Sequence, residues 1–222
     1  MVYEIVVTEV TLYNRLRCVA GYDRANGRMI RPEPGPGEFW PLIVCGPGTT
    51  FHPGHVVRFN GYKPETDLPH RTEDVVVAGD PLRAGALGED AFKAVLNECA
   101  ALTPKVVFEH HLIVSGARAY VPAGSPCGSL ACLTMDAGAL VFSDDVYEEH
   151  HKLRVGVTVN DRPLQLPVAA KDLKQAFGRK GVQAVRDLAP KNGPVQVRLG
   201  LARPFADIPD KCYLQVNGIH AL

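Results

Sequence analysis

The chain has 222 residues, of which 46% are hydrophobic and 22% charged, and this composition excludes a disordered polypeptide and suffices for one large or two small cores. Its 24 basic and 24 acidic residues balance to a net charge of zero, so a basic surface can arise only from local segregation of charge. No stretch reaches the roughly 20 apolar residues of a membrane span, and the first residues lack the pattern of a signal peptide. We therefore expect a cytoplasmic protein without a membrane partner.

The first half of the sequence has the pattern of short strands joined by turns. The 21 glycines and 18 prolines of the chain favour turns over long helices. Asn26 and Gly27 predict a hairpin turn because both tolerate positive φ, and Pro32, which lacks a backbone N–H, is expected to end a strand. Alternating and β-branched residues predict strands over residues 2–12, 15–21, 28–31, 55–62 and 75–78.

A long loop rich in proline and glycine is expected over residues 32–53. Its aromatic residues, Phe39 and Trp40, indicate that the loop is packed onto the fold. Apolar residues at helical spacing then predict a helix over residues 89–102, followed by a strand over residues 105–115. The cysteines are widely spread along the chain, and we expect them to be free, buried thiols: Cys18, Cys45, Cys99, Cys127, Cys132 and Cys212.

A turn-rich segment at residues 122–128 is expected to link two domains. The helical stretch that follows it, over residues 169–188, is expected to break near Gly178 and Gly181. Strands are predicted around this helix over residues 130–142, 153–159, 163–168, 195–201 and 212–216. Three strands, a helix and two strands are the element order of a five-stranded OB barrel. We therefore predict a mainly β fold with minor α content: two OB-like barrels in tandem, each with a helical insertion, over residues 1–122 and 128–222.

Short segments spread over nearly the whole chain carry a family resemblance. They read RCVAGYD at 17–23, GRMIRP at 27–32, PHRTED at 69–74, VRLGL at 197–201 and KCY at 211–213. Together they resemble the dual OB-containing domain family of bacterial proteins. The resemblance implies two OB-like barrels and a role connected with nucleic acid, and it implies no established catalytic residues. Met29 stands where an aromatic residue is expected, which weakens any stacking role at that position.

Arginine and aromatic residues gather around the predicted hairpin and the loop after it. Arginines bind phosphates in a bidentate manner, aromatic rings offer a surface on which bases stack, and OB barrels bind oligonucleotides on such strand faces. The alternative is a solvated hairpin beside a loop packed by its own aromatic residues. The candidate nucleic-acid-binding residues are Arg15, Arg17, Tyr22, Arg28, Arg31 and Trp40.

A second polar cluster consists of His70, Glu73 and Asp74. A histidine beside two carboxylates can bind a metal or move protons, and the alternative is a purely structural cluster. Strand alternation places Arg31 on the strand face opposite Arg28, so that it either points inward or lies at a barrel end. A buried arginine needs a carboxylate partner, and we expect this partner to be Glu73 or Asp74.

The sequence contains none of the common catalytic or cofactor motifs. It has no G-x-S-x-G elbow, no Walker-type phosphate loop and no dinucleotide fingerprint. His110 and His111 would point to opposite sides of a strand and could not bind one ion together, whereas His52 and His55 could chelate an ion from a loop. No metal site, cofactor or catalytic residue is predicted. Three functions remain, in order of preference. The first is a non-catalytic module that binds single-stranded DNA or RNA. The second is a protein-interaction subunit of a nucleic-acid machine. The third is a small-ligand enzyme with His70, Glu73 and Asp74 in a cleft between the barrels.

Overall fold

The computed structural model describes residues 1–65, 68–147 and 149–222, and the chain folds as two compact units. The first unit comprises Met1–Thr66 and Glu73–Cys99, and the second comprises Asp67–Thr72 and Ala100–Leu222. No helix among the described residues is long and apolar enough to cross a membrane.

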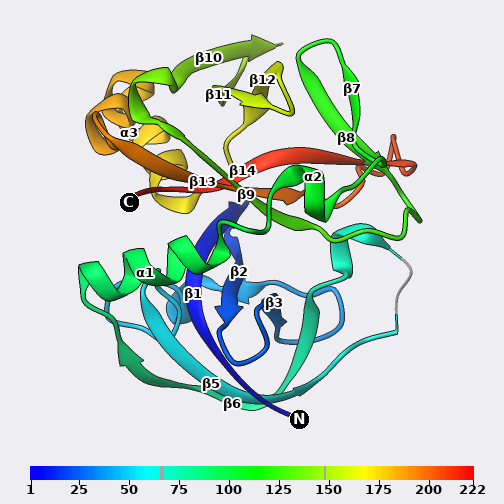
Figure 1. Cartoon of the computed structure of the whole chain (residues 1–222), viewed down its shortest axis with the longest axis vertical. Helices are drawn as coiled ribbons and strands as arrows, with labels where there is room; N and C mark the ends of the chain where they lie inside the picture. The colour runs from blue at the N-terminus through cyan, green and yellow to red at the C-terminus, as the bar shows by residue number, and fades with distance from the viewer. Residues whose placement is uncertain (66–67, 148) are drawn as a thin grey trace. The chain divides into compact units, whose positions relative to one another are not determined.

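The first unit is a closed barrel of antiparallel strands with one parallel junction (Figure 1). Its strands are β1 (Val2–Tyr13), β2 (Leu16–Asp23), β3 (Arg28–Glu33), β5 (His55–Tyr62) and β6 (Asp74–Ala86). The sheet runs β1-β5-β6-β3-β2, and the additional pairing of β1 with β2 closes it. The close crossing of β1 and β2 depends on Gly21, because a Cβ at that position would lie 2.6 Å from the carbonyl oxygen of Val6.

The loop between β3 and β5 is held against this barrel by two aromatic side chains. Trp40 packs on the fully buried Phe51 with 4.9 Å between ring centroids, and its indole N–H donates to the carbonyl oxygen of Pro32. Within the loop, β4 (Trp40–Pro41) pairs with β2 and leads into the short helix η1 (Leu42–Val44). The prediction that the aromatic residues pack this loop onto the fold is confirmed.

The second unit follows the same chain path with a more open barrel (Figure 1). A three-stranded sheet contains β10 (Val141–Tyr147), β11 (His150–Val159) and β12 (Arg162–Pro167). β13 (Pro194–Leu201) pairs with both β9 (Leu130–Asp136) and β14 (Lys211–Ala221) in the other sheet. The two sheets are joined where β9 continues through η3 (Ala137–Ala139) into β10, and where Val168 forms a parallel bridge with Val216. The predicted order of three strands, a helix and two strands is confirmed when β9 and β10, which η3 interrupts, are taken as one strand.

The helices of the chain are short apart from one in each unit. α1 (Glu89–Cys99) follows the last strand of the first barrel, so this helix is not inserted between strands as we expected. α3 (Lys171–Leu188) lies between β12 and β13, and it is interrupted at Lys180 and Gly181, where Gly181 has a φ of +72°. The predicted break in this helix is therefore confirmed at Gly181.

Two local predictions are wrong. Residues 105–115 do not form one strand, because Thr103 caps the short helix α2 (Pro104–Val107), and only β7 (Ile113–Ser115) is extended. Pro32 does not end β3, which continues to Glu33 in parallel pairing with β6. The N–H of Arg31 donates to the carbonyl oxygen of Glu73, so the nitrogen of Pro32 faces away from β6, toward β2, whose pairing with β3 ends at Ile30.

The boundary between the units differs from the predicted linker at residues 122–128. Residues 100–122 belong to the second unit, because β7 pairs with β8 (Arg118–Pro122) and β8 pairs in turn with β14. The N–H of Cys132 also donates to the carbonyl oxygen of Leu102. The hairpin of β7 and β8 thus extends the second barrel rather than completing the first.

A buried ion pair lies at the parallel junction of the first barrel. Arg31 and Asp74 are opposite each other in the β3–β6 register, their side chains are 8% and 0% exposed, and the guanidinium lies 2.9 Å from the carboxylate. Burial alone would lower the pKa of Arg31, but the Asp74 carboxylate outweighs it and the pKa is raised, which keeps the guanidinium charged. The expected carboxylate partner of Arg31 is thereby confirmed as Asp74.

Removing one member of this pair is expected to destabilise the first unit. Arg31→Met leaves a buried carboxylate without its cation and should lower the free energy of unfolding by roughly 3–5 kcal/mol, whereas Arg31→Met/Asp74→Leu should recover most of the loss. Urea unfolding followed by fluorescence of Trp40, the only tryptophan, measures this. Arg58→Met is the matched control: Arg58 forms an exposed ion pair with Glu4, and its loss should cost under about 1 kcal/mol. Equal effects of the two single substitutions would contradict the account.

Candidate functional site

The structure buries four of the six residues predicted to bind nucleic acid on the hairpin. Arg17, Tyr22, Arg31 and Trp40 are 3%, 7%, 7% and 7% exposed. Arg17 is covered because β4 pairs with β2 and places Trp40 directly opposite it, and its guanidinium donates to the carbonyl oxygen of Leu16. Only Arg15 and Arg28 reach the surface, so the hairpin does not present the predicted binding surface.

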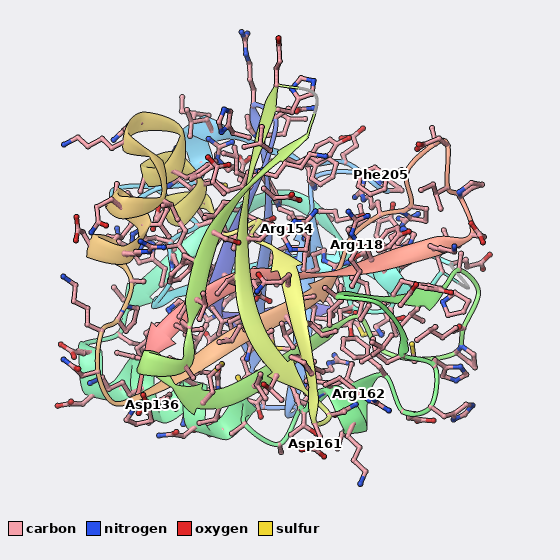
Figure 2. All side chains as sticks on the ribbon, turned by 90° about the horizontal axis from the view of Figure 1, so that it is seen from above. Arg118, Asp136, Arg154, Asp161, Arg162 and Phe205 are labelled. Atoms are coloured by element: carbon pink, nitrogen blue, oxygen red, sulfur yellow. The ribbon has the colours of Figure 1, made fainter. Side chains whose placement is uncertain are left out.

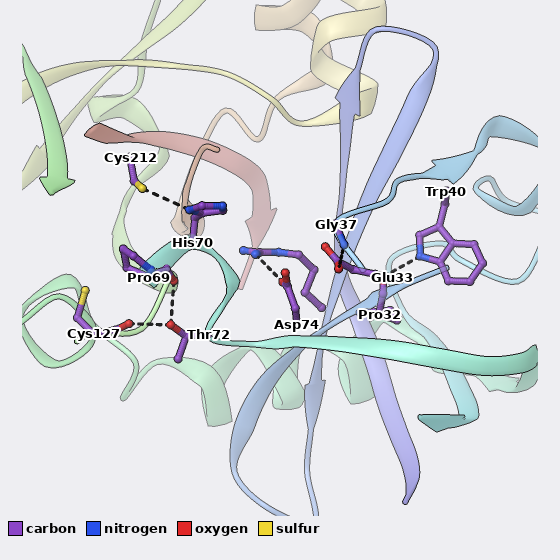
Figure 3. Close-up of polar contacts among 11 residues, drawn as sticks. Pro32, Glu33, Gly37, Trp40, Pro69, His70, Thr72, Asp74, Cys127 and Cys212 are labelled. Carbon is purple, nitrogen blue, oxygen red and sulfur yellow. Dashed lines mark hydrogen bonds and ion pairs between the residues drawn. The ribbon is translucent and has the colours of Figure 1, made fainter. Parts of the chain in front are cut away.

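The predicted polar cluster divides into separate contacts (Figure 3). Asp74 belongs to the first unit and pairs with Arg31. His70 belongs to the second unit, where its Nδ1 lies 3.4 Å from the sulfur of Cys212. Burial raises the pKa of the Cys212 thiol to about 11, so the thiol stays protonated at neutral pH and is a poor nucleophile. Next to His70, the Thr72 hydroxyl lies 2.9 Å from the carbonyl oxygens of both Pro69 and Cys127.

A pocket of about 300 Å³ lies on the outer side of the three-stranded sheet in the second unit. Strand alternation produces it: Leu153, Val155, Leu164 and Leu166 point into the core, so the residues between them point outward. The backbone N–H of Gln165 donates to the carbonyl oxygen of Ala117 at 2.8 Å, which fixes the β7–β8 hairpin as one wall. The pocket is lined by Ala117, Arg118, Ser143, Asp144, Asp145, Arg154 and Gln165.

The charges of the pocket are partly paired. Asp145 accepts a hydrogen bond from Arg154, which lowers the pKa of this carboxyl, and the charges of Arg118 and Lys152 lower it further. Asp144 contacts the Nδ1 of His151 at 2.7 Å. Within the part of the chain that the structure describes, the guanidinium of Arg118 has no hydrogen bond and no ion pair. One arginine of the pocket is thus fixed in place, and the other is available to a ligand.

A row of aromatic rings continues from this pocket. On β8, Arg118 and Tyr120 alternate with the buried Ala119 and Val121, so they share the outer face. Tyr120 lies opposite Tyr213 of β14, with 5.8 Å between ring centroids. Phe205, on the loop from β13 to β14, lies 6.3 Å from Tyr213 and is 55% exposed.

Basic side chains accompany the aromatic row. The ammonium group of Lys211 lies 5.0 Å from the centre of the Tyr120 ring, a cation–π distance. Figure 2 shows Arg154 over the three-stranded sheet, with Arg118 near it and Phe205 farther along the same face. We call this surface the basic-aromatic face, and it consists of Arg118, Tyr120, Lys152, Arg154, Phe205, Lys211 and Tyr213.

The predicted site residues do not include this face, although the sequence contains a signal for it. Arg118, Ala119, Tyr120 and Val121 alternate with the period of a half-buried strand, next to the turn-rich segment at residues 122–128. The acidic run of β10 has the composition of a solvated turn, whereas Ser143 and Asp145 in fact face the pocket.

One group of potential metal ligands occurs among the described residues. The ligand atoms of Glu109, His110 and His111 lie within 4.8 Å of one another. They gather because these residues form a turn, with a φ of +49° at Glu109, rather than the strand in which adjacent histidines would point apart. All three side chains are at the surface, and nothing further indicates a ligand there.

The two chain paths define the class of protein. Each unit contains the strands of a five-stranded Greek-key barrel, the OB fold. The sequence profile of the dual OB-containing domain family matches residues 3–219, and the chain belongs to that family. Searches of curated proteins and of solved structures found no match.

Burial of Cys212 leads to a prediction about its reactivity. None of the six cysteines forms a disulfide, and Cys18 is partly exposed whereas the other five are buried. At pH 7.5 iodoacetamide should modify Cys18 first and Cys212 only after unfolding, as read by peptide mass spectrometry. Because the pKa of the Cys212 thiol is higher in the folded state than in the unfolded state, the buried, protonated thiol contributes fully to the free energy of unfolding below about pH 8.5. This contribution is lost as the pH rises through about 11 and the thiol ionises. Rapid labelling of Cys212 in the folded protein would contradict this.

Proposed function

We propose that this protein is a non-catalytic module that binds single-stranded nucleic acid on the basic-aromatic face of its second unit. The observation that carries the proposal is the guanidinium of Arg118, which has no partner in the described part of the chain and lies on one strand face with the Tyr120 ring. Arginine holds phosphate oxygens in a bidentate manner, and aromatic rings stack with any base.

The position of the face within the fold supports the same function. OB barrels bind oligonucleotides across their second and third strands and the loops beside them. In the second unit these strands are β11 and β12, which carry Arg154 and Gln165 of the pocket. The loop between the last two strands carries Phe205. The pocket and the aromatic row therefore occupy the region that this fold offers to a linear ligand.

The charge distribution is consistent with a chain of zero net charge that nevertheless binds an anion. Arg118, Lys152, Arg154 and Lys211 lie on the face, and the adjacent Asp145 is neutralised by Arg154. Charge is thus segregated locally, as a neutral chain requires if it is to bind phosphates.

Binding and its salt dependence test the proposal. Fluorescence anisotropy with labelled single-stranded DNA and RNA should show binding that weakens between 50 and 200 mM salt. Three phosphate contacts give a slope of about −2 when the logarithm of the binding constant is plotted against the logarithm of the salt concentration. The affinity should therefore fall roughly 20-fold over this range. Absence of binding by a folded protein at low salt would overturn the proposal.

Substitutions locate the site. Phe205→Ala removes a stacking surface and should weaken binding by roughly 1–3 kcal/mol, and Arg118→Ala/Lys211→Ala should weaken binding and flatten the salt dependence. The matched control is Arg15→Ala/Arg28→Ala, which removes two cations from the surface of the first unit. Binding that depends on the control pair and not on Arg118 and Lys211 would place the site on the hairpin instead.

An apolar patch on the first unit favours protein interaction as a second candidate function. Tyr13 stacks on Phe39, and Leu16, Leu42 and Ile43 are 40%, 53% and 79% exposed nearby, where β4 pairs with β2 and leads into η1. Exposed apolar patches of this kind often mark protein contacts. A protein that co-purifies with the wild type and with Arg118→Ala, but not with Leu42→Glu/Ile43→Glu, would support it. Identical co-purification with all three would exclude it.

A further inference from the structure

Strand register decides which side chains around the pocket on the three-stranded sheet can reach a ligand. Residues directly opposite each other in an antiparallel pair share one face of the sheet. Asp144 lies opposite the buried Leu153 in the β10–β11 pairing, so its side chain is on the core side and outside the pocket. Ser143 lies opposite Arg154, so its side chain and that of Asp145, two residues further along β10, face outward.

Three hydrogen-bond donors from three different strands border this pocket. The guanidinium of Arg118 comes from β8 and the hydroxyl of Ser143 from β10, and neither has a partner within the described residues. The side chain of Gln165, on β12, extends across β11, because its Nε2 lies 3.0 Å from the position that a Cβ on Gly156 would occupy. This Nε2, unlike the Oε1 of the same amide, is not enclosed by protein and donates to no described residue. A ligand in the pocket therefore meets donors from β8, β10 and β12.

Cations outnumber carboxylates on the outer side of this pocket. Asp145 accepts a hydrogen bond from Arg154, and this bond, together with the charges of Arg118 and Lys152, lowers the pKa of the carboxyl group. Figure 2 shows Arg118 and Arg154 near each other at the three-stranded sheet. Because Arg154 neutralises Asp145, the charges of Arg118 and Lys152 remain without a paired carboxylate among the described residues. The pocket therefore favours a group with two negative charges.

We propose that this pocket binds a terminal phosphate of the single strand, an inference that rests on the proposed nucleic-acid-binding function. A phosphomonoester carries close to two negative charges at neutral pH and has three oxygens that accept hydrogen bonds. A phosphodiester inside the strand carries one negative charge and has only two such oxygens. The three donors and the two unpaired cations therefore match the end of a strand better than its interior.

The size of the pocket and the aromatic row beside it suit the end of a strand. A volume of about 300 Å³ is at the lower end of the range for small-ligand sites, as one terminal group requires. Tyr120 shares the outer face of β8 with Arg118, and the row continues from it through Tyr213 to Phe205. A strand whose terminal phosphate lies in the pocket can stack its first bases on these rings.

Oligothymidines that differ only at their ends test the inference. The fluorophore is attached inside the strand, and the three probes carry a 5′-phosphate, a 3′-phosphate, or hydroxyl groups at both ends. Anisotropy titrations should show a phosphorylated strand bound on the order of tenfold more tightly than the hydroxyl-ended strand, and the probe that gains affinity identifies the end that enters the pocket. Equal affinity for all three strands would overturn the inference while leaving the proposed function intact. Failure of every strand to bind would overturn both.

Uncharged substitutions separate recognition of the terminal phosphate from the effect of its charge. Ser143→Ala/Gln165→Met removes two donors without changing the charge of the protein, and it should bring the phosphorylated strand to within about twofold of the hydroxyl-ended strand. Thr158→Val is the matched control, because it removes a hydroxyl from an exposed position on the outer side of β11, opposite Pro163 and outside the pocket. This control should keep the full preference. A preference that persists in the double variant would show that the added charge alone is responsible and would overturn the inference.

Discussion

Each barrel is closed by a parallel junction between its third and last strands. In the first unit β3 and β6 meet there, and the buried ion pair of Arg31 and Asp74 spans the junction. In the second unit the corresponding contact is the apolar bridge of Val168 with Val216. An ion pair in a barrel wall needs both partners, whereas an apolar bridge tolerates conservative exchange. The equivalent junctions of the two units thus contain different side chains, an ion pair in the first and two valines in the second.

The junction of the second unit also determines which side chains are available to a ligand. Val168 follows β12 directly, so the bridge fixes the register in which Leu164 and Leu166 point into the core. Gln165 must then point outward, next to Arg154 on the neighbouring strand. The hairpin of β7 and β8 adds Arg118 and Tyr120 to the same face, and the loop before β14 adds Phe205. The proposed site is therefore a consequence of strand alternation on a closed sheet.

The sequence predicts the elements of this fold better than it predicts their exposure. Local signals sufficed for most strands of both barrels, for the break of α3 at Gly181 and for a carboxylate partner of Arg31, but not for β8 or for most of β10. The burial of Arg17 could not be inferred, because it depends on pairing with Trp40, which is far along the chain. Residues 100–122 were assigned to the wrong side of the boundary for the same reason: their partner, β14, lies near the other end of the sequence. Long-range pairing decides which arginines reach the surface, and local patterns do not contain that information.

The central claim is that the basic-aromatic face of the second unit, and not the arginine-rich hairpin of the first, binds nucleic acid. Amide chemical-shift mapping by NMR during titration with a single-stranded oligonucleotide tests it most directly, because it reports on every described segment at once. The account predicts shifts in β8, in β10 to β12 and in the loop between β13 and β14, with residues 15–31 unchanged. Shifts concentrated in residues 15–31, with none around Arg118 and Phe205, would contradict it.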